Sequence, residues 1–164
     1  MRFMGIDPGT AIVGYAFVEE NEYGDPIAVE YNVVTTKSTM KMPNRLQHIY
    51  KEITRLIAEY KPDAVGIEEM FFGKNVTAAI TVAQGRGVVL MALADAKLPI
   101  YEYKPAEIKQ TIAGSGNAPK AQMQEMVKTL LNLDQIPKPD DAADALAIAL
   151  TAMQASRWEQ LLDQ

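Results

Sequence analysis

The spacing of apolar residues divides the chain into a β-rich beginning and a longer region in which helices and strands alternate. Residues 1–7, 12–19 and 27–36 are short runs rich in Val, Ile, Tyr and Phe, separated by Gly, Pro, Asn and Asp. This pattern predicts three strands joined by short turns, as in an antiparallel meander. Over residues 43–60 the apolar residues recur at helical spacing, with Lys and Glu on the other face, which predicts an amphipathic helix.

Farther along the chain, short apolar runs and helical periods follow one another. The runs at 64–67 and 98–103 predict two further strands. Helices are expected at residues 75–97, 106–113, 120–133 and 140–158. A meander followed by such alternation is typical of an α/β fold, here a mixed five-stranded sheet flanked by helices. We expect one domain over residues 1–158 and a short tail at 159–164.

Composition narrows the chemistry that this domain could perform. The chain has 164 residues, of which 48% are hydrophobic and 23% charged, values that are ordinary for one globular domain and exclude extensive disorder. It has no cysteine, which excludes disulfide frameworks, thiolate metal sites and cysteine nucleophiles. Its single histidine, His48, argues against a catalytic triad or a histidine-rich zinc site.

From the sequence we expect neither a targeting segment nor a membrane-spanning helix. Arg86, Asp95 and Asp144 interrupt the longest uncharged stretches, so no segment is expected to reach the roughly 18 apolar residues of a membrane helix. The chain begins directly with strand-like sequence rather than with the apolar region and cleavage site of a signal peptide. We therefore expect a cytoplasmic protein.

Carboxylates follow two of the predicted buried strands. Asp7 ends the first strand, immediately before the turn Pro8-Gly9, at the edge where open α/β sheets place their functional sites. An Asx-turn is the alternative for Asp7, and the residues alone leave both open. Glu68 and Glu69 follow the strand at 64–67. Because strand side chains alternate, only one of these two glutamates faces the same side as Asp7, and the pattern does not say which.

Two further carboxylates share one face of the last predicted helix. Asp141 and Asp144 are three residues apart, and Asp140 suits the N-cap. Apolar residues surround Asp144 in the sequence, so we expect its charge to be paired or bound to a metal. Four carboxylates without His or Cys suit Mg²⁺ or Mn²⁺. Two such ions, about 3.5–4 Å apart, activate water and stabilise the leaving oxygen in phosphodiester hydrolysis, which points to a nuclease.

Several motifs, in order along nearly the whole chain, resemble the RuvC family of bacterial Holliday-junction resolvases within the ribonuclease H-like superfamily. The matching motifs are Gly5-Ile6-Asp7-Pro8-Gly9-Thr10, Gly14-Tyr15, Ile67-Glu68-Glu69-Met70-Phe71-Phe72 with Lys74-Asn75, Gln84-Gly85-Arg86-Gly87, Lys109-Gln110-Thr111 and Asp141-Ala142-Ala143-Asp144-Ala145-Leu146-Ala147. Thr10 stands where the family often has Ser, a change that preserves the hydroxyl.

The resemblance implies a ribonuclease H-like fold and a Mg²⁺-dependent endonuclease. It assigns Asp7, Glu68, Asp141 and Asp144 as the metal-binding catalytic residues and so favours Glu68 over Glu69. Two Mg²⁺ ions are expected in each site, with Mn²⁺ able to substitute. The resemblance further implies symmetric cleavage of two strands of a four-way DNA junction by a homodimer, in partnership with the RuvA–RuvB branch-migration complex.

Charge is distributed unevenly along this acidic chain, whose formal net charge is -5. Residues 37–128 carry 13 Lys and Arg against 9 acidic residues, so the middle of the chain is expected to face DNA phosphates. The residues expected to contact DNA are Lys74, Arg86, Lys109, Lys120 and the aromatic Phe71. The resemblance supports Phe71, Lys109 and Lys120, whereas Phe72 is expected to anchor the loop in the core.

The predicted helix at 75–97 is unusually rich in small residues and apolar around much of its circumference. We expect part of this helix to form a dimer interface, as the resemblance also implies, with burial in the core as the alternative. Two other functions stay open: a related nuclease that processes structured RNA, and a junction-binding protein without catalytic activity. An actin-like nucleotide-binding module would need a second lobe, for which 164 residues leave no room.

Overall fold

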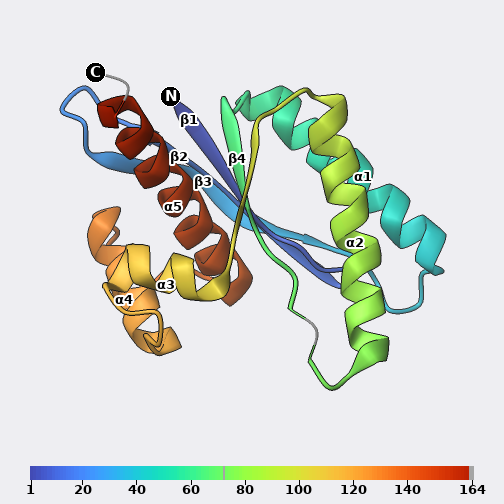
Figure 1. Ribbon diagram of the computed structural model, residues 1–164. Coiled ribbons are helices and arrows are strands. Elements are labelled where there is room, and N and C mark those ends of the chain that lie inside the picture. The colour runs from blue at the N-terminus through green and yellow to red at the C-terminus, as the bar shows by residue number, and fades with distance from the viewer. Residues whose placement is uncertain (72, 163–164) are drawn as a thin grey trace.

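A five-stranded sheet forms the centre of the protein, with helices on both of its faces (Figure 1). The computed structural model describes residues 1–71 and 73–162. The first three strands form the predicted antiparallel meander, and the last two run parallel to the first, in the order β3-β2-β1-β4-β5. The strands are β1 (Arg2–Asp7), β2 (Ile12–Glu20), β3 (Pro26–Thr35), β4 (Ala64–Glu68) and β5 (Ile100–Tyr103).

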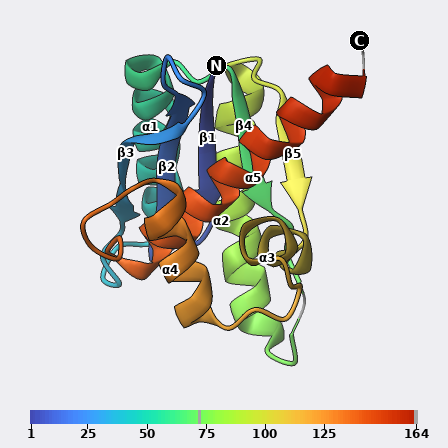
Figure 2. The same ribbon diagram turned by 90° about the vertical axis from the view of Figure 1, so that its left-hand side faces the viewer.

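Five helices form the outer layers. They are α1 (Met42–Tyr60), α2 (Val76–Asp95), α3 (Pro105–Ala113), α4 (Lys120–Leu130) and α5 (Asp140–Leu162). Helices α1 and α2 cover one face of the sheet, and α5 crosses the other face with α3 and α4 packed beside it (Figures 1 and 2). The mixed α/β sheet flanked by helices is therefore confirmed.

The alternation of side chains along the strands creates two cores. Met4, Ile6 and Ile67 belong to the core shared with α1 and α2, whereas Phe3 and Ala64 belong to the core beneath α5. Successive strand residues point to opposite faces. The residue that follows Ile6 and the residue that follows Ile67 therefore both face α5.

Two helix ends differ from the sequence-based expectation, while the other elements begin and end within two residues of it. Helix α4 ends at Leu130 instead of residue 133, and Asn132 adopts the left-handed region with φ of 50°. Helix α5 continues past Trp158 to Leu162, because the residues Glu-Gln-Leu-Leu contain no helix breaker. Residues 159–162 of the expected tail are thus helical and exposed, and residues 163–164 lie outside the described residues.

Helix α2 is apolar over most of its length. By length and composition alone it could cross a membrane, contrary to the expectation from the sequence. In the fold, Val89, Ala92 and Leu93 are buried in the core shared with α1, while only 28% of the most apolar 18-residue stretch of the helix is buried. On the outer side of this helix, the apolar side chains of Ile80 and Met91 are exposed.

Candidate active site

Two carboxylates lie at the ends of adjacent parallel strands. Asp7 is the last residue of β1 and Glu68 the last residue of β4. The residues before them, Ile6 and Ile67, are register partners, so the two carboxylate-bearing ends are at the same level of the sheet. Both side chains face α5 by strand alternation. This is the carboxyl edge at which open α/β sheets form their sites.

The packing of α5 adds a third carboxylate. Gly14 on β2 is the register partner of Asp7, and the backbone of α5 passes directly over it. A Cβ atom at Gly14 would lie 2.0 Å from the carbonyl oxygen of Asp141. Only glycine allows so close an approach, so the Gly14-Tyr15 motif brings Asp141, near the start of α5, next to Asp7.

The carboxylate oxygens of Asp7, Asp141 and Asp144 lie within 4.8 Å of one another. Glu68 does not belong to this tight group, but its negative charge is close enough to raise the pKa of Asp7. Four acids from three separate elements therefore converge on one end of the sheet.

The environment of the site makes proton loss from Asp7, Glu68 and Asp144 less favourable than from ordinary carboxyl groups. Burial, followed by the charges of Asp144, Glu68 and Asp141, raises the pKa of Asp7 to about 7. Burial and the charge of Asp144 raise the pKa of Glu68, and burial raises that of Asp144. A set of crowded carboxylate oxygens without nitrogen or sulfur ligands fits a hard divalent cation such as Mg²⁺ or Mn²⁺, which relieves the repulsion among the acids.

The environment of Asp144 differs from the expected one. Its side chain is 44% exposed instead of embedded among apolar residues, because its side of the helix turn faces an open cavity while Ala143 and Ala145 are buried. Lys120 Nζ lies 3.8 Å from Asp144 Oδ2 and 3.3 Å from Asp140 Oδ2. The expectation that the Asp144 charge is paired is thus met by a lysine.

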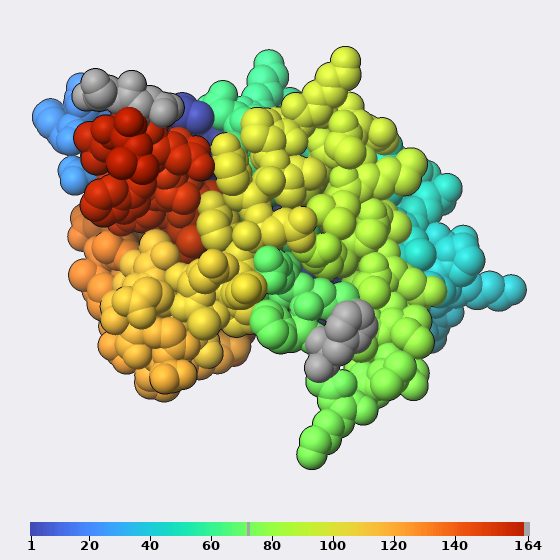
Figure 3. Space-filling view, viewed as in Figure 1, coloured from blue at the N-terminus to red at the C-terminus, as the bar shows by residue number. Residues whose placement is uncertain are grey.

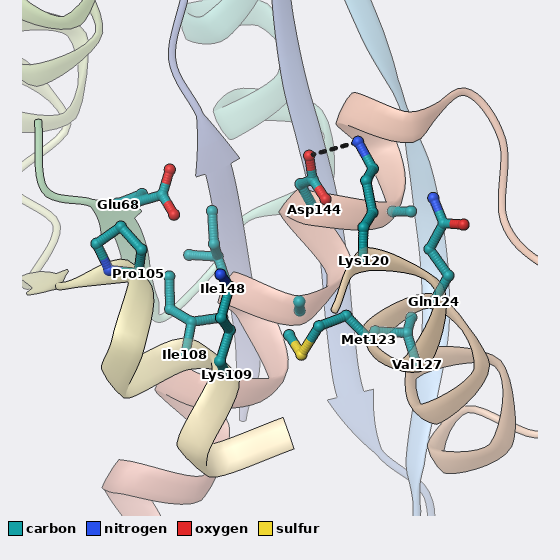
Figure 4. Close-up of a pocket in the computed structure, with 12 residues that line it drawn as sticks. Glu68, Pro105, Ile108, Lys109, Lys120, Met123, Gln124, Val127, Asp144 and Ile148 are labelled. Atoms are coloured by element: carbon teal, nitrogen blue, oxygen red, sulfur yellow. Dashed lines mark ion pairs between the residues drawn. The ribbon is translucent and has the colours of Figure 1, made fainter. Parts of the chain in front are cut away.

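A cavity of about 290 Å³ extends from these acids between α3, α4 and α5. Figure 4 shows Glu68 and Lys109 on one side of this cavity and Asp144 and Lys120 on the other. Lys109 partly offsets the rise in the pKa of Glu68 through its positive charge. The two lysines thus bring positive charge to the rim of a strongly acidic site.

The floor of the same cavity is apolar, and sequence reasoning did not identify it. Its residues come from α3, α4 and α5 and are Pro105, Ile108, Met123, Val127, Ala147 and Ile148. Helical periodicity marks most of these positions as an apolar face. Only the packing of three helices around the acids shows that part of this face lines the site.

The chain matches a protein-family model, and the matched residues include the four acids of this site. The model for the crossover junction endodeoxyribonuclease RuvC covers residues 3–152. The RuvC protein of Ruminiclostridium cellulolyticum is 48% identical over 164 residues, which cover 99% of this chain and 97% of the relative. That of a Roseiflexus species is 53% identical over 149 residues, covering 91% and 88%. The chain belongs to the RuvC family.

Solved RuvC structures share the fold as well. Thermus thermophilus RuvC has a TM-score of 0.89 at 34% identity, with 97% of each chain covered. The same protein in complex with a Holliday junction substrate has a TM-score of 0.88 at 32% identity, with 96% of each chain covered. The ribonuclease H-like fold expected from the motifs is therefore confirmed.

The RuvC-like motif that begins at Ile67, near the end of β4, continues into a loop at the surface. Phe71 in this loop is 67% exposed, and Lys74 is exposed beside it. Figure 3 shows the described residues of this stretch of chain, in green, at the lower edge of the molecule. The prediction that Phe72 anchors this loop falls on a residue outside the described ones.

The arginine of the Gln84-Gly85-Arg86-Gly87 motif lies in a different setting from the expected one. The Arg86 side chain is only 15% exposed. Its guanidinium pairs with the carboxylate of Glu102 on β5, and its Nε donates a hydrogen bond to the carbonyl oxygen of Glu68. Its charge is therefore paired with Glu102 within the chain, and its expected contact with a DNA phosphate stays a prediction.

Proposed function

We propose that this chain cuts four-way DNA junctions as a metal-dependent endodeoxyribonuclease, with Asp7, Glu68, Asp141 and Asp144 as its catalytic metal ligands. The observation that carries this proposal is the cluster of Asp7, Asp141 and Asp144 at the end of β1 and the start of α5, with Glu68 at the adjacent end of β4. Membership of the RuvC family supports the substrate, since Thermus thermophilus RuvC is described in complex with a Holliday junction substrate.

The four acids hold divalent cations in this proposal. A cation bound there supplies Lewis acidity, which favours ionisation of the attacking water and stabilises the departing oxygen. Asp7, whose pKa is about 7 without metal, gives up its proton as the cation binds. We further propose two Mg²⁺ ions in each site, with Mn²⁺ as a substitute, because four carboxylates match the charge of two divalent ions.

Two lysines at the cavity contribute positive charge to the proposed reaction. Lys120 lies beside Asp144, and Lys109 lies on the Glu68 side of the cavity. Both can donate hydrogen bonds to the phosphate as negative charge builds on its oxygens. Electrostatic stabilisation of this kind is usually the largest single contribution to the rate enhancement. In our proposal these lysines stabilise the transition state more than they contribute to overall DNA affinity.

The loop after β4 engages the junction itself. Phe71 is exposed at a position where its ring could stack on an unpaired base, and such stacking is worth about 1–3 kcal/mol per base. Lys74 in the same loop is exposed and can approach a phosphate. We propose that these two residues recognise the open centre of the junction.

A second copy of the chain pairs with the first through α2. Val76, Ile80 and Met91 are 65%, 55% and 58% exposed on this helix, and the exposed small residues Ala83 and Gly87 lie between them. Their spacing of three or four residues places them on one stripe. Small residues allow two helices to approach closely, and two copies supply the two active sites that symmetric cleavage needs.

Two further parts of the proposal rest on the family alone. We propose that the dimer works with the RuvA–RuvB branch-migration complex, which would move the junction to the site of cleavage. We also propose that it acts in the cytoplasm, where the chromosomal DNA of bacteria lies.

One cleavage experiment tests the function. The protein is incubated with a synthetic four-way junction, a linear duplex and an RNA hairpin, each with Mg²⁺ or with EDTA. Paired symmetric nicks in the junction alone, only with Mg²⁺, support the proposal. Binding without cleavage would favour a non-catalytic junction-binding protein, and cleavage of the hairpin an RNA-processing nuclease. Asp144→Asn should abolish cleavage, whereas Asp134→Asn, in an exposed segment before α5, should leave it intact.

A further inference from the structure

The inner side of α2 contacts both of the strand ends that carry carboxylates. Gly85 packs against the loop after Asp7, where a Cβ atom would lie 2.3 Å from the carbonyl oxygen of Gly9. The next residue, Arg86, reaches the last residue of β4 through its Nε, which lies 3.4 Å from the carbonyl oxygen of Glu68. Two consecutive residues of one helix thus lie against the ends of β1 and β4.

Arg86 also ties the end of β4 to its other neighbour in the sheet. Its guanidinium forms an ion pair with Glu102, and Glu102 is the register partner of Ile67, the residue before Glu68. A guanidinium is planar and has several donors in a rigid arrangement, so one side chain can hold α2, the carbonyl of Glu68 and β5 in a fixed geometry.

Arg86 adds to the backbone hydrogen bond from Glu69 N to the carbonyl oxygen of Tyr103, which already holds the end of β4. Glu68 is its last residue, and the segment from Glu69 to Asn75 forms no helix or strand among its described residues. The Glu68 carboxylate lies at the end of the strand next to Asp7, whose oxygens crowd against those of Asp141 and Asp144, so repulsion between like charges favours movement of Glu68 away from the other acids. A contact that fixes the backbone of Glu68 opposes this movement.

We propose that Arg86 is a positioning residue that holds Glu68 in register with Asp7 for metal binding. This inference rests on the proposed function, in which Glu68 is a metal ligand. Arg86 acts through the backbone of Glu68 and through Glu102, and it does not contact the DNA. Loss of such a supporting contact costs about 10–100-fold in metal affinity in other metal sites.

The test measures metal binding separately from DNA binding. Mn²⁺ affinity of the DNA-free protein is measured by isothermal titration calorimetry, and junction affinity is measured in EDTA. Arg86→Met should weaken Mn²⁺ binding at least about tenfold and raise the Mg²⁺ concentration for half-maximal cleavage by a similar factor. Its junction affinity in EDTA should stay within about twofold of wild type, as for the control Lys51→Met, which removes an exposed lysine of α1.

Two milder variants keep the inference testable if Arg86→Met does not fold. Glu102→Gln removes the ion pair but leaves Arg86 in place, and Arg86→Lys keeps the charge but not the planar fork. Both should weaken Mn²⁺ binding, by a smaller factor than Arg86→Met. If Arg86 were instead a phosphate ligand, Glu102→Gln would free it, leave Mn²⁺ affinity unchanged and tighten junction binding, and that outcome would overturn the inference.

A parallel variant separates this inference from the function on which it rests. Glu68→Gln should itself weaken Mn²⁺ binding. If it does so while the Arg86 and Glu102 variants bind Mn²⁺ like wild type, the positioning role is wrong and the ligand set stands. If Glu68→Gln also binds Mn²⁺ like wild type, the proposed ligand set is wrong.

Discussion

The carbonyl oxygen of Asp141 lies where a side chain on Gly14 would begin, only 2.0 Å from the position of its Cβ. Gly14 is also paired with Asp7 across the β1–β2 ladder. One glycine therefore sets how closely α5 approaches the sheet, and through it how closely Asp141 approaches Asp7. The geometry of the acidic site depends on a backbone contact that carries no charge.

Gly14→Ala should damage both stability and activity. The added methyl group would meet backbone atoms of α5, which cannot move aside as a flexible side chain could, so we expect the free energy of unfolding to fall by about 2 kcal/mol or more. Displacement of Asp141 by about 1 Å should slow junction cleavage on the order of a hundredfold. Urea unfolding and a cleavage time course measure the two effects.

Gly116→Ala is the matched control, since its nearest heavy atom would lie at an ordinary 3.5 Å. It should change the unfolding free energy and the cleavage rate little. A Gly14→Ala protein with wild-type stability and rate would contradict the proposed role of this contact.

The pKa of Asp7 predicts how the metal-free protein responds to pH. The pKa is about 7 in the folded protein against 3.8 for an ordinary aspartate, so the folded state binds more protons between these values and its stability falls as pH rises through them. The loss attributable to Asp7 is up to about 4 kcal/mol. Asp7→Asn removes this term and should flatten the pH dependence of urea unfolding in EDTA.

The same substitution should abolish cleavage while it raises the stability of the metal-free protein at pH 8, because a charged buried group is replaced by a neutral one. Mg²⁺ should stabilise the wild type and have little effect on Asp7→Asn. Parallel pH profiles for the two proteins in EDTA would contradict the assigned pKa shift.

Lys120→Met should affect the chemical step more than binding. Lys120 lies 3.8 Å from Asp144 at the edge of the cavity, where its charge can stabilise the phosphate in the transition state. We expect single-turnover cleavage to slow about 10²–10³-fold, with a much smaller loss of junction affinity in EDTA. Lys128→Met, near the end of the same helix, should behave like wild type; an equal effect in both variants would point to bulk charge instead.

Ile80→Glu should separate the two copies of the proposed dimer. The side chain of Ile80 is 55% exposed in the middle of the apolar stripe of α2, and a carboxylate there would be buried without a partner on association. Sedimentation at micromolar concentration should give a dimer for wild type and a monomer for Ile80→Glu. Thr54→Glu, at an exposed position of α1, should remain a dimer. A monomeric wild type would refute the proposed interface.

The sequence predicted the elements and the acidic positions because both leave local signals. Strand alternation showed that Glu68 and Glu69 face opposite sides but not which side α5 covers. That choice depends on the packing of Ile67 into the core beneath α1 and α2. The end of α5 was misplaced for a similar reason, since no Gly or Pro follows Trp158 and no local signal marks Leu162 as its last residue.

The setting of Arg86 could not be read from local patterns at all. Its charge and its place in a basic stretch of sequence favoured a DNA contact, because an arginine is most often exposed. The ion pair with Glu102 joins α2 to β5, two elements whose proximity is a property of the fold. The apolar floor of the cavity is similar, since it forms only where α3, α4 and α5 meet.

Anomalous diffraction from crystals soaked in Mn²⁺ tests the central claim most directly, because it locates the cation relative to the four acids. We predict anomalous peaks among the carboxylates of Asp7, Glu68, Asp141 and Asp144, and the loss of at least one peak in Asp7→Asn. Crystals of wild type that give no peak among these four side chains at saturating Mn²⁺, or a peak only elsewhere on the protein, would contradict the account.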